Sequence, residues 1–263
     1  ELDFLDQPRV IPQSIEVGAI EYPQPLLRVI YVDPTQTENR DGTGWGNTMN
    51  SDNLQNAIDL AAIYSATNAP TADDLNEAYV FVKGDNDTQF DGITLRSGVN
   101  IFGSIDPTNV TDSVRYTIDE ETGEYLYPHL HEDVATVVNR RPGLLGPSTK
   151  RTVLSSVTTG EKNTFSAEVP TRIDGVAISS VTDNNPLGAV LSPVLDINPT
   201  SSVDGAIPAV AVSHILVADN NASGATNVNV ANVNNALIYE VLFRDNAVAS
   251  TNYVLNLGST GYG

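Results

Sequence analysis

The sequence predicts an all-β domain folded as a solenoid, with one helix closing its N-terminal side. From Tyr79 onward the chain carries short β-type runs separated by turns rich in Asn, Asp, Gly, Ser and Thr. Helices do not alternate with these runs, which excludes an α/β sheet and leaves a sandwich, a barrel or a solenoid. Two observations favour the solenoid. The motif Asp-Gly-(Ile/Val) occurs at 91–93 and again at 174–176. In the second half of the chain, small residues alternate along the runs where the strands of a sandwich usually carry aromatic residues.

The segments that precede the helix are expected to be an extended leader, a buried strand and a loop. Residues 1–27 contain four prolines without a sustained period, and we expect an extended leader there. The β-branched run 28–32 predicts a buried strand, and the glycines of loop 33–50 are typical turn residues.

A helix over 53–65 follows. Asp52 is the predicted N-cap, with Gln55 at the capping-box spacing. One apolar stripe then recurs with helical periodicity and predicts a helix that covers the first strand of the solenoid. The stripe consists of Leu54, Ala57, Ile58, Ala61 and Ala62.

The remaining elements are short strands, because each run is apolar or β-branched and is bounded by turn residues. They are expected at 79–82, 92–95, 99–105, 152–157, 172–179, 189–197, 209–218, 228–233, 236–243 and 253–257. Residues 106–148 are long, charged and interrupted by proline, which predicts an excursion from a single domain spanning 28–263. The C-terminus has no capping signature, so we expect a chain truncated within a longer solenoid.

Charge and composition narrow the class of partner. The net charge is −20 at pH 7 and the chain has only three Lys, which argues against nucleic acid as a partner. Cysteine is absent, so there is no thiolate nucleophile and no disulfide framework. No apolar run is long enough to span a bilayer, so direct membrane insertion is not expected. The 25 Asn residues suit turns and amide ladders between stacked strands.

The glycines before the helix do not form a nucleotide site. A P-loop requires a Lys and a longer interval than Gly42, Gly44 and Gly46 provide, and the third glycine of a dinucleotide fingerprint is replaced by Met49. No cofactor is therefore predicted.

Residues 30–62 instead resemble the N-terminal segment of right-handed parallel β-helix proteins from bacterial surfaces. The shared features are a strand ending in Asp, a Gly-rich loop with Trp, and a helix of the form x-x-L-Q-x-A-I-x-x-A. Segments 78–84, 92–105, 139–157 and 171–181 follow that family's order, and the similarity covers about 28–257. The family includes adhesin-like proteins of gut Bacteroidetes, autotransporter passenger domains and pectate-lyase-like enzymes. The resemblance therefore implies a right-handed parallel β-helix with an N-terminal capping helix, and it leaves activity open.

The sequence lacks the residues expected of an enzyme that cleaves polysaccharides. The motifs of pectin hydrolases are missing, and Asp73-Asp74 lies ahead of the stacked strands. A lyase base would be Arg172 or Arg244, but no acid cluster is spaced around either. Asp174 and Asp245 belong to turn pairs, so no catalytic residue is predicted.

One segment has metal-ligand character. His129 and His131 share a strand face and have Glu132 and Asp133 beside them, but a third ligand is not evident. We predict no metal site there. His214 lies alone in an apolar run and is interpreted as a satisfied interior or turn histidine.

Aromatic side chains offer a binding surface. Tyr116, Tyr125 and Tyr127 cluster in the excursion and are the candidate ligand-binding residues, because tyrosines can stack on a glycan or meet a protein partner. Trp45 between two glycines is interpreted as an anchor that seats its loop beside the helix.

These observations lead to three hypotheses. The first is a non-catalytic, exported, adhesin-like protein that binds a polysaccharide or a cell-surface protein through the solenoid flank and loop 106–148. The second is a polysaccharide lyase or glycoside hydrolase with an unfamiliar site. The third is a structural stalk. Oligomeric state and ligand identity stay open at this point.

Overall fold

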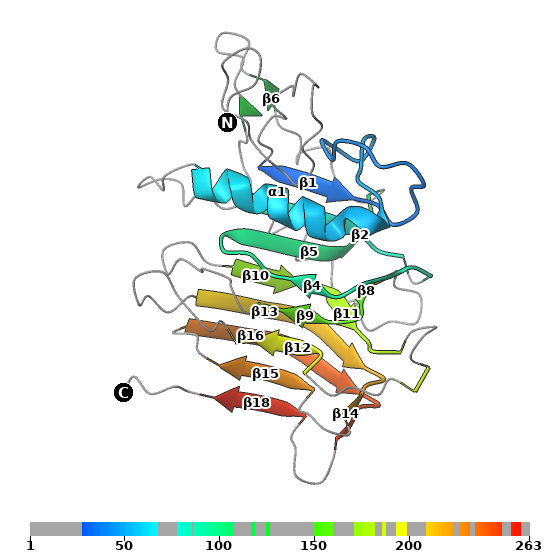
Figure 1. Ribbon diagram of the computed structural model, residues 1–263, viewed down its shortest axis with the longest axis vertical. Coiled ribbons are helices and arrows are strands. Elements are labelled where there is room, and N and C mark those ends of the chain that lie inside the picture. The colour runs from blue at the N-terminus through cyan, green and yellow to red at the C-terminus, as the bar shows by residue number, and fades with distance from the viewer. Residues whose placement is uncertain are drawn as a thin grey trace, which may run out of the picture.

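The computed structural model describes residues 28–67, 78–85, 87–107, 117–118, 125–126, 150–159, 171–181, 186–187, 193–198, 209–222, 227–231, 235–248 and 254–258. Most of these residues lie in parallel β-strands stacked one above another, with a single α-helix at the N-terminal end of the stack (Figure 1).

The described elements are a short 3₁₀ turn, one helix and the strands that follow the chain around the stack. They are β1 (Val29–Val32), η1 (Ser51–Asn53), α1 (Leu54–Thr67), β2 (Ala78–Lys83), β3 (Gln89–Phe90), β4 (Ile93–Thr94), β5 (Val99–Ile105), β6 (Thr117–Ile118), β7 (Tyr125–Leu126), β8 (Thr152–Leu154), β9 (Val157–Thr158), β10 (Thr171–Asp174), β11 (Val176–Ile178), β12 (Leu195–Ile197), β13 (Ala209–Ala218), β14 (Asn221–Ala222), β15 (Val228–Ala231), β16 (Asn235–Arg244), β17 (Ala247–Val248) and β18 (Leu255–Gly258).

Two parallel sheets account for most strands. The nine-stranded sheet has the order β1-β2-β5-β10-β13-β11-β8-β3, with β16 also paired to β13, and the five-stranded sheet has the order β18-β15-β12-β9-β4. Because β13 pairs with β10 along its first half and with β11 along its second, the larger sheet curls around a corner. We call each pass of the chain through both sheets a tier. The tiers are β2–β4, then β5 with β8 and β9, then β10–β12, β13–β15 and β16–β18.

Alternation along each strand decides which side chains form the core. In the first sheet one buried column of aliphatic residues faces inward, and it lines up through the strand register because parallel pairing stacks equivalent positions. This column is Ile30, Val80, Ile101, Ile173 and Val212. The neighbouring positions point to the opposite side of the sheet and carry the aromatic cluster of Tyr31, Phe81 and Phe102.

The corners use left-handed backbone. The first corner has Gly175 at φ 71° and His214 at φ 51° in neighbouring tiers, and the next corner has Asp219 at φ 58° and Asp245 at φ 52°. Glycine adopts this region freely and Asp tolerates it better than most residues, which explains the Asp-Gly and Asp-Asn pairs at these turns. The two Asp-Gly-(Ile/Val) motifs, at 91–93 and 174–176, do not occupy equivalent corners, however. Asp174 lies in register with Phe102, whereas Phe90, just before Asp91, lies in register with Leu154.

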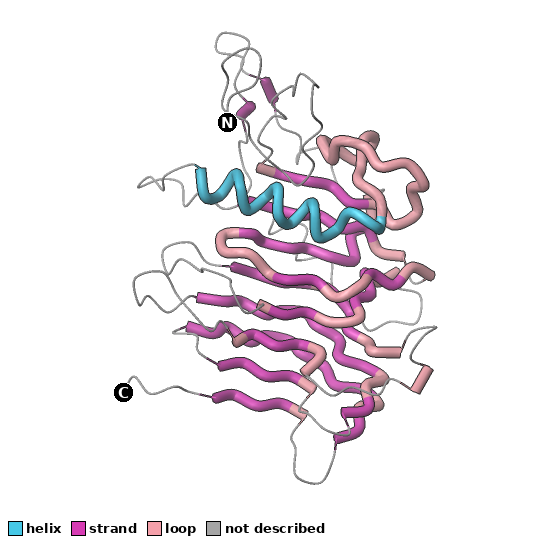
Figure 2. Tube along the Cα trace, in the orientation of Figure 1, coloured by secondary structure: helices cyan, strands magenta, loops and turns pink. Residues whose placement is uncertain are grey.

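The N-terminal end of the stack is closed by the chain itself. Helix α1 buries Leu54, Ala57, Ile58 and Ala61 against the core, as its apolar stripe predicts. Figure 2 shows the helix lying alongside the first strands of the stack. The predicted capping box is wrong. Asn50 is the N-cap, its side chain makes no capping hydrogen bond to the backbone, and helical structure begins at Ser51.

Most predicted strands are present, and 99–105 and 209–218 match to the residue. The prediction omitted β3 and the short pair β14–β17. The leader 1–27 lies outside the described residues, as does most of the excursion 106–148. Within that excursion, β6 and β7 pair antiparallel, with Ile118 opposite Tyr125.

Amide ladders connect successive tiers. Asn256 Nδ2 donates to Asn229 Oδ1 at 2.8 Å, and Asn229 Nδ2 donates to Asp196 Oδ1 at 2.8 Å. At the second corner Asn220 Nδ2 donates to Asn246 Oδ1 at 2.9 Å. The abundance of Asn thus has the structural use that composition suggests.

Candidate binding site

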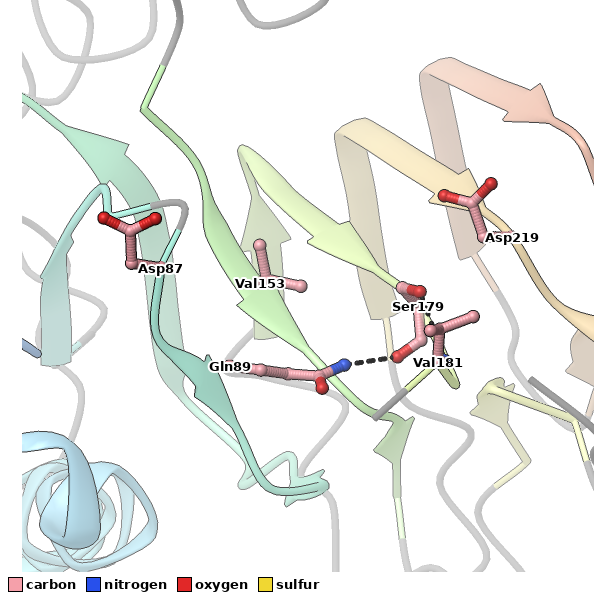
Figure 3. Close-up of a pocket in the computed structure, with 6 residues that line it drawn as sticks. All are labelled: Asp87, Gln89, Val153, Ser179, Val181 and Asp219. Atoms are coloured by element: carbon pink, nitrogen blue, oxygen red, sulfur yellow. Dashed lines mark hydrogen bonds between the residues drawn. The ribbon is translucent and has the colours of Figure 1, made fainter. Parts of the chain in front are cut away.

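An open pocket with a volume of about 460 Å³ lies on the outer side of the curled sheet. It crosses β3, β8 and β11 and reaches the residue that follows β13, so the strands beneath it belong to neighbouring tiers (Figure 3). Three inter-strand spacings of about 4.8 Å give it a reach of roughly 14 Å across the strands. Its lining residues are Asp87, Gln89, Val153, Ser179, Val181 and Asp219.

Gln89 defines one wall of the pocket. Its Nε2 donates to the carbonyl oxygen of Ser179 at 2.7 Å, which fixes the side chain between β3 and the end of β11 (Figure 3). Val153, on the strand between them, is in register with both Gln89 and Ala177. The result is a small apolar area bordered by fixed polar groups.

Asp87 is held by a turn at one end of the pocket. The carboxylate of Asp85 accepts a hydrogen bond from Thr88 Oγ1 at 2.8 Å and a longer one from the backbone N–H of Asp87 at 3.5 Å. The N–H of Asp85 also donates to Arg151 O at 2.9 Å, which ties the turn to the strand segment beginning at β8. Asp87 itself is exposed.

Asp219 lies at the opposite end, on the second corner (Figure 3). The adjacent Asn220 is buried and anchors this corner, because its Oδ1 accepts from Ser180 N–H at 2.7 Å and its Nδ2 donates to Ala218 O at 2.8 Å. Arg244 Nη2 lies 3.6 Å from Asp219 Oδ2, and both side chains are about half exposed. The carboxylate therefore points to solvent from a rigid corner.

A second polar cluster lies at the first corner, on the outer side of β10 and β13. The fully buried Asp174 carboxylate contacts Arg172 Nη2 at 2.8 Å, Ser213 Oγ at 2.5 Å and His214 Nδ1 at 3.0 Å. Arg172 also lies 5.5 Å from the centre of the Phe102 ring. Ser213 hydrogen-bonds to the carboxylate and to Arg172, so this cluster binds two tiers together rather than presenting a nucleophile to a histidine base.

Two sequence-based interpretations can be compared with these contacts. No acid cluster was expected around Arg172 or Arg244; Arg172 pairs with the carboxylate of Asp174, and Arg244 lies 3.6 Å from Asp219 and from Asp245. Asp174 and Asp245 are close to these arginines in the sequence, whereas Asp219 comes from another tier and lies beside Arg244 only in the fold. The interpretation of His214 as a turn histidine with its polar needs met is confirmed by its φ of 51° and its contact with Asp174.

The predicted ligand-binding tyrosines are not among the described residues that line this pocket. Tyr116 and Tyr127 are outside the described residues, and of Tyr125 only the backbone is described, in β7. The segment with His129, His131, Glu132 and Asp133 is also outside them, as is Asp73-Asp74. The structure therefore neither brings these side chains together nor separates them.

Trp45 is a packing anchor, but its partner differs from the predicted one. Its ring packs edge-on against Tyr31 at 5.0 Å between centroids, on the outer aromatic cluster. Helix α1 packs on the opposite, inner side of the same sheet.

The pocket residues were not singled out from the sequence. One signal was present: the Asp-Asn pairs at 219–220 and 245–246 both follow ten-residue strands, β13 and β16. That pattern marks equivalent exposed corners. It does not reveal that Asp87 and Gln89 lie opposite the first of them.

Searches of family models, curated proteins and solved structures each found no match for this chain. Among the described residues, no group of three or more His, Cys, Asp or Glu side chains is arranged to hold a metal ion. Within the same part of the chain, no helix is both long and apolar enough to cross a membrane.

Proposed function

We propose that this protein is a non-catalytic, exported cell-surface protein of adhesin type, folded as a right-handed parallel β-helix, that binds a glycan. The observation that carries the proposal is the open pocket between Asp87 and Asp219, which places fixed polar groups around the apolar side chains of Val153 and Val181. Sugars present both hydroxyl groups and apolar ring faces, and such a surface complements them. The resemblance of residues 30–62 to bacterial surface proteins supports the proposed location.

The shape of the pocket suits an extended chain. It is open and runs across stacked strands, so an oligosaccharide can lie along the stack with its ends free. Gln89 Nε2 is committed to Ser179 O, which leaves the Gln89 Oε1 and the Asp87 and Asp219 carboxylates to accept hydrogen bonds from sugar hydroxyls. Preformed acceptors of this kind reduce the ordering cost of binding.

Charge narrows the ligand class. Two carboxylates line the pocket and the chain carries a net charge of −20, so a polymer of uronic acids would be repelled. Neutral sugars and amino sugars are favoured. This argues against pectate-type substrates in particular.

A glycoside hydrolase is the second candidate, because Asp87 and Asp219 face one pocket from opposite ends (Figure 3). Hydrolysis requires one carboxyl that stays protonated as the general acid, usually through apolar surroundings. Both side chains are exposed, and Asp219 lies near the cation of Arg244. These surroundings favour binding over cleavage.

The experiment is a glycan-array screen with the labelled protein, followed by incubation of each bound glycan with excess protein. We expect selective binding of neutral or amino-sugar glycans, with no new reducing ends or unsaturated products. Binding to no glycan would contradict the proposal, and product formation would establish the enzymatic alternative. The predicted contribution of loop 106–148 stays a prediction.

A further inference from the structure

The pocket between β3 and the second corner carries charge of one sign. Among the described residues that line it, the two charged ones are Asp87 and Asp219, and none is Lys, Arg or His. Both side chains are exposed, and they lie at opposite ends of the pocket (Figure 3). A ligand that spans the pocket therefore meets a negative group at each end.

The Asp87 carboxylate is available to a ligand. The ion pairs found within the described part of the chain do not include it. The turn beneath it is built by the Asp85 carboxylate, which accepts from Thr88 Oγ1 and from the N–H of Asp87. The turn thus uses the backbone of Asp87 and leaves its side chain directed to solvent.

The second corner also keeps a negative charge. Arg244 lies 3.6 Å from Asp219 and 3.6 Å from Asp245, so one guanidinium is shared between two carboxylates. The side chains of Arg244 and Asp219 are each about half exposed, and an exposed pair of this kind contributes little. Asp219 can therefore attract a second cation from the pocket side.

The surface between the two carboxylates suits a sugar ring. Val153 and Val181 supply apolar contact, and Gln89 is fixed by its hydrogen bond to Ser179 O, with its Oε1 left to accept from a hydroxyl group. Ser179 Oγ accepts from Val181 N–H at 3.3 Å, which holds this side of the pocket in place. Rings can thus rest at the centre while cationic groups reach the ends.

We propose, on the basis of the glycan-binding function above, that the pocket selects oligosaccharides of amino sugars whose amines are free and protonated. An ammonium group has three donors and no acceptor, whereas a carboxylate only accepts. Hydrogen bonds between such charged groups are roughly twice as strong as neutral ones. A hydroxyl or acetamide group at the same carbon of the sugar lacks this charge. Amines on one chain also reinforce each other, because binding at one end holds the next amine near the other carboxylate.

The charge of the whole chain favours the same ligand. The net charge of −20 attracts a cationic oligosaccharide over a distance and has no such effect on a neutral one. A basic peptide would be attracted as well. It lacks the hydroxyl-bearing rings that Gln89 and Val153 complement, so the sugar is the better fit.

The test is isothermal titration calorimetry of the wild-type protein with three β-1,4-linked tetrasaccharides. They are built from glucosamine, N-acetylglucosamine and glucose, and so carry an amine, an acetamide or a hydroxyl group at the same ring carbon. At low salt and about pH 5.5, where a primary amine is protonated, we expect the glucosamine tetramer to bind about tenfold more tightly than either of the others. This advantage should shrink as salt is added or as the pH rises to about 9.

A double variant isolates the two carboxylates. Asp87→Asn combined with Asp219→Asn removes both charges and keeps an oxygen acceptor at each position, and Asn tolerates the left-handed backbone at 219. We expect the three tetramers to bind this variant within about threefold of one another. Asp245→Asn removes a charge of the same sign outside the residues that line the pocket. It is the control and should keep the preference for the amine.

The outcomes separate this proposal from the glycan-binding function itself. Equal or tighter binding of the glucose or N-acetylglucosamine tetramer to the wild-type protein would overturn the selection for amines and leave glycan binding standing. Binding of none of the three would also overturn it, and the array screen then decides separately whether any glycan binds. Tetralysine is the competitor without sugar rings. If it displaced the glucosamine tetramer at equal concentration, the pocket would recognise charge alone, and the proposal would fail.

Discussion

The side-chain amide of Gln55 pairs with both backbone groups of Thr94, as a neighbouring strand would. Thr94 N–H donates to Gln55 Oε1 at 2.8 Å, and Gln55 Nε2 donates to Thr94 O at 3.2 Å. One side chain on α1 thus completes the hydrogen bonding of β4, the last strand of its sheet.

Replacement of Gln55 should therefore weaken the fold more than its partial burial suggests. Gln55→Leu keeps helix propensity but leaves two backbone groups of Thr94 without this partner, and we expect a loss of about 1–3 kcal/mol in the free energy of unfolding. Urea titration followed by circular dichroism measures the change. The control is Asn56→Ala on the exposed side of α1, expected within about 0.5 kcal/mol of wild type. An equal effect of both variants would contradict the assigned role.

Asp174 should be the most sensitive charged residue among those described in β10 and β13. Asp174→Ala leaves Arg172 and Ser213 without their carboxylate in a buried setting, and we expect a loss of about 3–5 kcal/mol. Asp245→Asn, at an exposed corner, serves as the matched control and should change stability by less than about 0.5 kcal/mol. Thermal unfolding by calorimetry compares the two. A stable Asp174→Ala protein would show that the cluster does not hold the tiers together.

Acid stability should depend on Asp33. Burial raises the pKa of its carboxyl, but hydrogen bonds from Lys83 and Thr35 and the charge of Lys83 outweigh this, so the pKa lies below its ordinary value of 3.8. A lowered folded pKa means that the stabilisation is complete above about pH 4 and is lost as pH falls through the folded pKa. Urea unfolding from pH 6 to 2.5 should show this loss in wild type.

The Asp33→Asn variant isolates that effect. It is expected to be less stable than wild type at pH 6, with the difference shrinking as pH falls below 3.8. A difference that stays constant across the range would assign the stabilisation to hydrogen bonding that does not depend on the charge.

The free energy of unfolding lost when an Asn side chain is removed should depend on where that residue lies in the stack. Asn220 is buried and bonds to Ser180, Ala218 and Asn246, so Asn220→Ala should cost about 2–4 kcal/mol. Asn256→Ala removes one exposed ladder bond and should cost about 0.5 kcal/mol. Chemical denaturation of both variants tests the ranking, and the reverse order would be inconsistent with an anchored second corner.

Local pattern was enough to predict most of the fold. The strands at 99–105 and 209–218 are apolar or β-branched along their length, and the apolar stripe of α1 follows a regular period, so both could be read from neighbouring residues. The helix start was misplaced because Gln55 has the spacing of a capping box but is used by Thr94. A long-range contact decided its role.

The pocket could not be predicted in the same way. Asp87, Val153 and Asp219 come together only through the register of separate tiers, and that register depends on loops of unequal length between them. The two Asp-Gly motifs illustrate the difficulty, because those at 91–92 and 174–175 look alike in the sequence but occupy different corners of the fold. The composition suggested stacked strands, but only the structure shows which residues of one tier lie beside which residues of the next.

The proposed binding function is tested most directly by titrating the glycan selected on the array into three proteins by calorimetry. Asp219→Asn removes a pocket carboxylate and keeps a residue that tolerates the left-handed corner, whereas Asp245→Asn makes the same change at the equivalent corner of the next tier. We expect affinity to fall about tenfold for Asp219→Asn, from the loss of a charged hydrogen-bond acceptor, and to stay unchanged for Asp245→Asn. Equal affinity of Asp219→Asn and wild type would contradict a glycan site in this pocket.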